Sequence, residues 1–122
     1  MFVRRLNDCE EFTAGDCSTL REILHPDKTD LAICYSLAHA KVAVGQTTTP
    51  HRLMTSEVYY ILQGRGRMHI HEQVADLTVG DTVYIPPLTT QYIENTGDGD
   101  LIFLCIVDPA WRSEDEEILT AQ

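Results

Sequence analysis

Basic residues are scarce in this chain. Of its 122 residues, 9 are Lys or Arg and 19 are Asp or Glu, so 9 − 19 gives a net charge of −10. A surface of this sign repels the phosphate backbone of nucleic acids and anionic lipid headgroups. We therefore expect no nucleic-acid partner and no binding to a membrane surface.

Long hydrophobic runs are missing as well. The longest apolar run covers residues 101–107, whereas a membrane-spanning helix needs about 20 apolar residues. The first residues turn polar directly after Arg4 and Arg5, without the apolar stretch that is typical of a signal peptide. The sequence therefore predicts a protein without a membrane segment that is located in the cytoplasm.

Paired cysteine motifs are also absent. The chain has 4 cysteines, at positions 9, 17, 34 and 105, and no two of them form a C-x-x-C pair. Cys34 and Cys105 lie in apolar, strand-like runs, where a reduced thiol packs as a small hydrophobic group. We expect free thiols, which suit a reducing cytosol.

The dominant pattern in the sequence is alternation with a period of two. In residues 33–44 it places Ala38, Ala40, Val42 and Val44 on one face of a strand. Residues rich in Val, Ile, Tyr, Phe or Thr follow at 57–62, 66–71, 81–85, 90–95 and 101–107. Turn formers separate these segments, so the pattern predicts one all-β domain, an antiparallel sandwich or barrel.

Three segments are less regular. Residues 101–107 do not alternate, which predicts a strand covered on both faces, in the barrel wall or at a subunit contact. Residues 20–24 fit a short helix or an edge strand, since Pro26 would end either, and we favour the strand. The acidic run at 113–117 is typical of a solvated chain end, although it also fits a last helical turn.

Two spaced motifs carry the functional signal. The first places Gly45, His51, Glu57 and Gly64 in the pattern G-x5-H-x-H-x3-E-x6-G, with Leu53 at the second His position. The second follows G-x5-P-x-G-x2-H-x3-N through Gly80, Pro86 and Asn95, with Leu88 in place of the second Gly and Gln91 in place of the His.

These motifs resemble those of the cupin superfamily, and the flanking segments resemble small single-domain cupins. The resemblance implies an all-β, double-stranded β-helix, which is a jelly-roll barrel, and a homodimer. It divides the chain into an N-terminal arm with a possible edge strand (1–30), a cupin barrel (31–112) and an acidic tail (113–122).

The resemblance also implies a metal cage, which in metal-bearing cupins consists of three imidazoles and one carboxylate. Here the matching positions hold His51, Leu53, Glu57 and Gln91. A divalent ion (Mn, Fe, Ni or Zn) would therefore bind through His51, Glu57 and the Gln91 amide oxygen. A second imidazole would have to come from the strand at 66–71, where alternation puts Met68 and Ile70 toward the core and turns His69 and His71 outward.

A metal-free interior is the alternative. Glu57 and Gln91 would then hydrogen-bond to each other and to His51, because buried polar groups need partners. Either arrangement leaves a central pocket for a small molecule. We expect Tyr59, Gln91 and Leu53 to line that pocket and Trp111 to cover the mouth of the barrel.

Two functions follow from these alternatives. The first is an enzyme that acts on a small polar or anionic metabolite, with Glu57 and His51 as the catalytic residues that move protons. The resemblance allows isomerase, epimerase or dioxygenase chemistry without choosing among them. The second is a metal-free module that binds a small-molecule ligand without catalysis.

Overall fold

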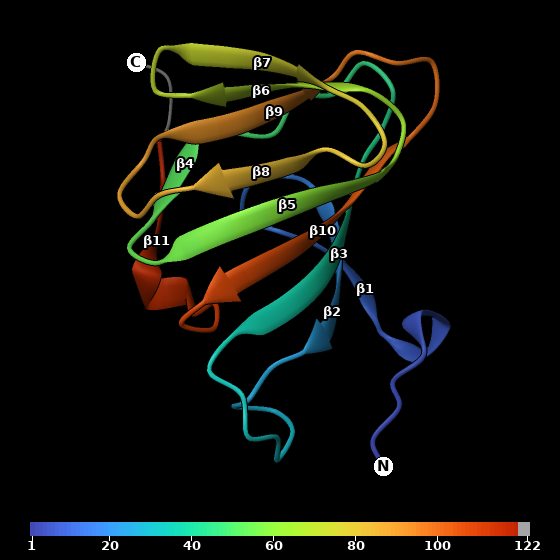
Figure 1. The fold of residues 1–122 in the computed structure, drawn as a ribbon, viewed down its shortest axis with the longest axis vertical. Coiled ribbons are helices and arrows are strands. Elements are labelled where there is room, and N and C mark those ends of the chain that lie inside the picture. The colour runs from blue at the N-terminus through green and yellow to red at the C-terminus, as the bar shows by residue number, and fades with distance from the viewer. Residues whose placement is uncertain (120–122) are drawn as a thin grey trace.

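Two antiparallel sheets form the molecule in the computed structural model, which describes residues 1–119 (Figure 1). The six-stranded sheet has the order β1-β2-β3-β10-β5-β8, and the five-stranded sheet has the order β11-β4-β9-β6-β7. The strands are β1 (Glu11–Thr13), β2 (Thr19–Leu24), β3 (Ser36–Val42), β4 (His51–Leu53), β5 (Ser56–Gln63), β6 (Gly66–Ile70), β7 (Gln73–Leu77), β8 (Thr82–Ile85), β9 (Gln91–Asn95), β10 (Leu101–Asp108) and β11 (Glu116–Ile118). This architecture is the predicted double-stranded β-helix.

In the part of the chain that the structure describes, helical structure is limited to two short 3₁₀ turns, η1 (Leu6–Asp8) and η2 (Ser113–Asp115). Across residues 1–119, no helix combines the length and the apolar character needed to cross a membrane.

The apolar core fills one part of the space between the sheets. Ile61, Leu101, Phe103 and Ile93 alternate with outward residues along β5, β10 and β9, and each is at most 1% exposed. The aromatic rings of Phe103 and Tyr59 pack with their centroids 4.4 Å apart. These residues form one buried cluster with Met68 of β6, Leu77 of β7 and Ile85 of β8.

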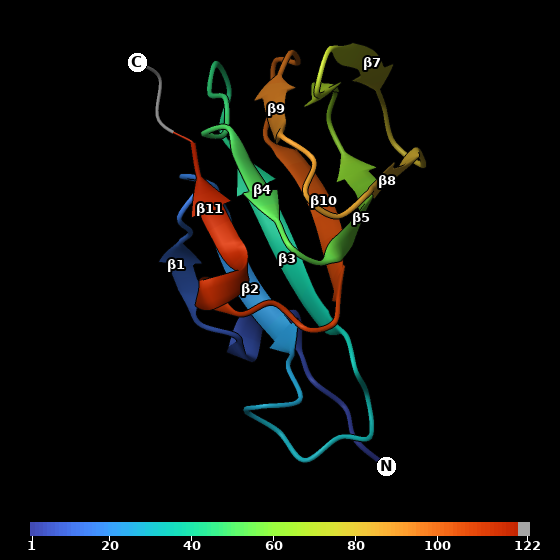
Figure 2. The ribbon, with the colours of Figure 1, turned by 90° about the vertical axis from the view of Figure 1, so that its left-hand side faces the viewer.

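Small residues leave space on the other side of the interior. Ala38 and Ala40 of β3 face inward there, beside Leu20 of β2, and all three line a cavity. Across from them lie β4 and β11, which the turned view places in front of β2 and β3 (Figure 2). The cavity therefore lies between the two sheets.

Six strands were predicted correctly from alternation or composition, β3, β5, β6, β8, β9 and β10, and the segment 20–24 is a strand, as favoured. It is not an edge strand, because β1 pairs with its outer side. The prediction that Val44 lies on the buried face is wrong: β3 ends at Val42, the chain turns at Gly45 (φ +76°), and Val44 is 50% exposed.

The outer face of β10 also differs from the prediction. Its residues alternate between the buried inner face and an outer face where Ile102 and Leu104 are half-buried and Ile106 is 37% exposed. We predicted that both faces of this strand are covered. Within one chain, only its inner face is buried. Cys34 differs too, since it precedes β3 and is exposed, while all four cysteines are free thiols.

Three strands carried no clear sequence pattern: β1, β7 and β11. The acidic run at 113–117 forms η2 and the start of β11, which pairs with β4 through Glu116, Glu117 and Ile118. Ordered strands thus extend beyond residues 31–112 at both ends, because β1 and β2 come from the N-terminal arm and β11 from the acidic tail.

Candidate functional site

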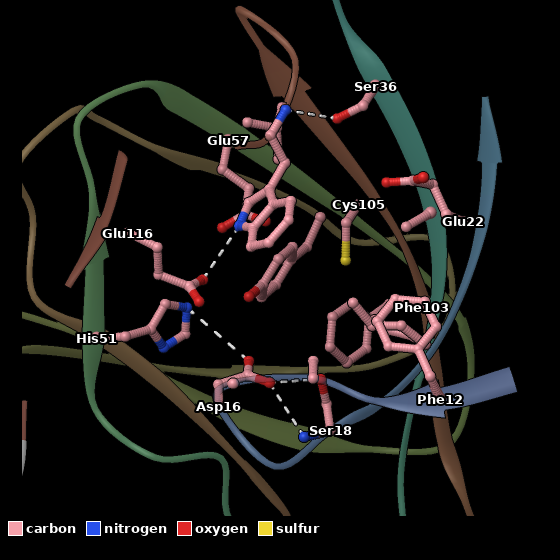
Figure 3. A pocket seen from close by; sticks show the side chains of 18 of the residues that line it. Phe12, Asp16, Ser18, Glu22, Ser36, His51, Glu57, Phe103, Cys105 and Glu116 are labelled. Atoms are coloured by element: carbon pink, nitrogen blue, oxygen red, sulfur yellow. Dashed lines mark hydrogen bonds and ion pairs between the residues drawn. The ribbon is translucent and has the colours of Figure 1, made fainter. Parts of the chain in front are cut away.

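A cavity of about 260 Å³ opens between the sheets (Figure 3). Its walls come from β1, β2, β3, β5 and β10 on one side and from β4 and β11 on the other, with the loop between β1 and β2 along its edge. Polar groups concentrate in this wall: Asp16, Glu22, His51, Glu57, Tyr59, Cys105 and Glu116.

His51 presents one ring nitrogen to the cavity. The side chain is 3% exposed, and its Nδ1 lies 2.9 Å from the carbonyl oxygen of Thr49. Because a carbonyl oxygen only accepts, Nδ1 carries the proton in the neutral ring and Nε2 has a free lone pair. Asp16 Oδ2 lies 3.8 Å from Nε2, beyond hydrogen-bond range.

Glu57, Gln91 and Tyr59 form a buried hydrogen-bond chain. The Gln91 Nε2 donates to Glu57 Oε1 over 3.0 Å, and the Tyr59 hydroxyl donates to Gln91 Oε1 over 3.1 Å. Gln91 pairs in register with His51 across β9 and β4. Tertiary pairing thus brings His51, Glu57 and Gln91 into one region, where the resemblance to the cupin motifs placed them.

Burial controls the protonation of Glu57. Loss of solvent raises the pKa of its carboxyl to about 8 from 4.5, and the Gln91 hydrogen bond acts in the opposite direction. The nearby carboxylates of Asp16 and Glu116 raise it further. Burial also raises the pKa of the Tyr59 hydroxyl well above 10. At neutral pH the cavity therefore holds a neutral carboxylic acid that can donate a proton.

The donor atoms do not fit a metal ion as they are arranged. The Gln91 amide oxygen accepts from Tyr59, and its NH₂ group donates to Glu57, so the amide is oriented by these two side chains. Leu53, at the second imidazole position, has no donor atom. Within residues 1–119, no group of three or more His, Cys, Asp or Glu side chains is placed to hold a metal.

The other predicted residues lie as follows. Tyr59 lines the cavity, whereas Gln91 lies behind Glu57 and the buried Leu53 is not part of the cavity wall. His69 points outward from β6, where it stacks on Tyr92 and lies 2.8 Å from Glu94 Oε1. His71 is exposed after β6, so neither histidine joins His51.

Three carboxylates of the cavity, Asp16, Glu22 and Glu116, were not predicted from the sequence. Asp16 lies in the loop between β1 and β2, where its Oδ1 accepts from the Ser18 backbone N–H (3.0 Å) and hydroxyl (2.6 Å). Glu116 belongs to the acidic run, and its Oε2 accepts from the Trp111 indole N–H over 3.3 Å. The D-x-S spacing signals a turn at Asp16, but no local pattern shows that this turn lies across from β4.

Comparison with known proteins agrees with this geometry. A family model described as a cupin domain matches residues 38–107, which include both motifs. The chain belongs to the cupin family.

The curated relatives of this cupin include an uncharacterised protein of Methanocaldococcus jannaschii, 46% identical over 109 residues that cover 88% of this chain and 86% of the relative. An oxalate-binding protein of Thermotoga maritima is 37% identical over 51 residues, 42% of each chain. Among solved structures, a predicted oxalate decarboxylase of Thermotoga maritima has a TM-score of 0.76 at 23% identity, covering 88% of this chain and 99% of that one, and shows the shared fold.

The raised pKa of Glu57 predicts how stability depends on pH. Above pH 4.5 the unfolded chain loses the Glu57 proton, whereas the folded protein keeps it up to about pH 8. Raising the pH through this window therefore lowers the free energy of unfolding, by on the order of 5 kcal/mol from this group. Glu57→Gln replaces the titrating carboxyl group with a neutral amide and should therefore flatten that part of the pH dependence.

Urea unfolding at pH 5 to 9 measures this difference. The free energy of unfolding of the wild type, relative to Glu57→Gln, should fall between pH 5 and pH 8 and then level off. The exposed Glu114→Gln serves as the control and should follow the wild type. If the difference in the free energy of unfolding between the wild type and Glu57→Gln stays constant with pH, the raised pKa of Glu57 is contradicted.

Proposed function

We propose that this cupin binds a small polar metabolite in the cavity and moves protons on it through Glu57 and His51. The observation that carries the proposal is that a buried, protonated carboxyl group and an imidazole nitrogen with a free lone pair line the same cavity. A general acid and a general base on one ligand are the requirements for a proton-transfer reaction of the isomerase or epimerase type.

The hydrogen bonds assign the two roles. Gln91 engages Oε1 of Glu57, and no hydrogen bond within residues 1–119 engages Oε2. The Glu57 proton is thus available to a ligand oxygen or nitrogen, while Nε2 of His51 accepts a proton from another ligand atom. Exchange with solvent through the mouth of the cavity then restores both side chains, so protons balance over one cycle.

This proposal requires no metal ion. Gln91 is held by its hydrogen bonds to Tyr59 and Glu57, and Leu53, at the second imidazole position, supplies no donor atom. Purified protein without added metal is therefore expected to lack a stoichiometric divalent ion.

Ligand binding is tested by filling the cavity. Ala38 lines the cavity, so Ala38→Phe should weaken binding of a metabolite by about tenfold or more, whereas Ala75→Phe on the exposed surface of β7 should not. A panel of sugars, hydroxy acids and amines can be screened by fluorescence of Trp111, the only Trp of the chain. Equal binding by both variants contradicts the cavity as the binding site.

Proton transfer is measured on the metabolite found in that screen. Incubation in D₂O should introduce deuterium at the ligand carbon or heteroatom that loses its proton, as followed by NMR. Glu57→Gln and His51→Ala should each slow this exchange by about 100-fold or more. Binding without exchange in the wild type would contradict the catalytic role and favour a module that only binds.

The metal requirement is tested by restoring the missing imidazoles. Leu53→His with Gln91→His places three imidazoles and Glu57 at the motif positions, and it also removes the Gln91 hydrogen bonds. We expect affinity for Ni²⁺ or Mn²⁺ to rise on the order of 100-fold over wild type, measured by calorimetry. Near-stoichiometric metal in untagged wild-type protein that is lost in His51→Ala would overturn the metal-free proposal.

We also propose a homodimer through the outer face of the six-stranded sheet. Apolar side chains occupy adjacent register positions there: Ile106 lies opposite Val58, and Leu104 lies opposite Tyr60. Tyr60, Leu62, Tyr84 and Ile106 are 37–60% exposed. Because the centre of this face lacks acidic residues, two copies can meet there despite the net charge of −10.

The dimer is tested with Leu104→Glu. A buried carboxylate without a partner is costly, so this change should convert a dimer into a monomer in sedimentation velocity. Val74→Glu, on the exposed part of β7, is the matched control and should leave the mass unchanged. A wild type that sediments as a monomer contradicts the proposed contact.

A further inference from the structure

The charges around the cavity all have one sign. Four carboxyl groups line it, those of Asp16, Glu22, Glu57 and Glu116, and no Lys or Arg is among its lining residues. Glu22 is neutralised by Lys28, whose Nζ lies 2.5 Å from Oε1. Within residues 1–119, Asp16 and Glu116 form no ion pair with Lys or Arg. Within these residues, no Lys or Arg therefore balances the negative charge of Asp16 and Glu116 in the wall.

Hydrogen-bond acceptors also face one another without a donor between them. Nε2 of His51 lies 3.8 Å from Asp16 Oδ2, while Asp16 Oδ1 is already engaged by Ser18. Glu116 uses Oε2 to accept from Trp111, which leaves its other oxygen free of hydrogen bonds within residues 1–119. His51 is only 3% exposed and lines the cavity. Its Nε2 makes no hydrogen bond within residues 1–119 and lies beside Asp16 (Figure 3).

We infer that the ligand of this cavity is a small organic cation with N–H donors, such as a primary ammonium group on a short carbon chain. An ammonium group has three donors and one positive charge, which match the acceptors His51 Nε2, Asp16 and Glu116. This inference rests on the proposed function, since it names the ligand class for the same cavity.

The remaining walls suit the carbon part of such a ligand. Phe12, Tyr59, Phe103 and Trp111 line the cavity together with Leu20 and Val107. Aromatic faces attract cations, and apolar side chains cover methylene groups. A volume of about 260 Å³ lies below the usual range for drug-sized ligands, so it suits a small metabolite.

An anionic ligand fits the same wall poorly. A carboxylate on the ligand would place another negative charge next to Asp16 and Glu116. No Lys or Arg lines the cavity to offset this repulsion. The ligand class therefore differs from that of the oxalate-binding relative, whose similarity to this chain covers 42% of its length.

A matched set of three compounds tests the charge preference. n-Butylammonium, n-butanol and butyrate share a four-carbon chain and differ in charge, and each can be titrated into the full chain while Trp111 fluorescence is recorded. We expect butylammonium to bind about tenfold or more tightly than either of the others, with an affinity that falls as salt is raised. Butyrate binding as tightly as butylammonium would overturn the inference.

Isosteric variants locate the bound ammonium. Asp16→Asn and Glu116→Gln keep the size of each side chain and the acceptor oxygens that hold Ser18 and Trp111, but they remove the charge. Each should weaken butylammonium by about tenfold while changing butanol by less than about twofold. Glu114→Gln, an exposed neighbour outside the cavity wall, should leave all three titrations unchanged.

The outcomes separate this inference from the proposed function. If butyrate or butanol binds best and Ala38→Phe abolishes that binding, the cavity still holds a ligand, and only the cationic class is wrong. If butylammonium binds equally to Asp16→Asn, Glu116→Gln and Ala38→Phe, it lies outside the cavity and the inference fails. The proposed function itself is overturned if none of the three compounds changes Trp111 fluorescence and if every metabolite of the panel that binds has the same affinity for Ala38→Phe as for the wild type.

Discussion

The interior of this cupin is organised by one carboxyl group that is kept away from water inside a barrel. Glu57 is 7% exposed, and its hydrogen-bond partner in the protein is the amide of Gln91. An ionised carboxylate in such a place is unstable unless a cation or several donors surround it. The group therefore keeps its proton, and the burial that makes ionisation costly also makes Glu57 a proton donor near neutral pH.

The same constraint explains the role of Gln91. Its amide donates to Glu57 and accepts from Tyr59, so both ends of this side chain are satisfied and its orientation is set by the chain of bonds. At the motif position where the family pattern has an imidazole, this cupin thus has a group that holds Glu57. The interior is organised around hydrogen bonds, and the acidic cavity wall extends from this network toward Asp16 and Glu116.

Much of the barrel could be predicted from the sequence, since alternation is strong wherever a strand has one buried face. That holds for β3, where Ala38, Ala40 and Val42 share the inner face. It fails for β7, where four of the five residues are exposed and alternation is hidden. It fails for β11 as well, because an acidic segment forms a strand only when β4 offers backbone partners.

The sequence implied that His51, Glu57 and Gln91 come together, because its two motifs resemble the cupin pattern, in which these positions share one interior. Only the tertiary structure decided what surrounds them. Asp16 and Glu116 reach the cavity through a loop and a strand from opposite ends of the chain, 100 positions apart in the numbering. No local pattern encodes such a meeting, since it depends on long-range backbone pairing that β4 and β2 make possible.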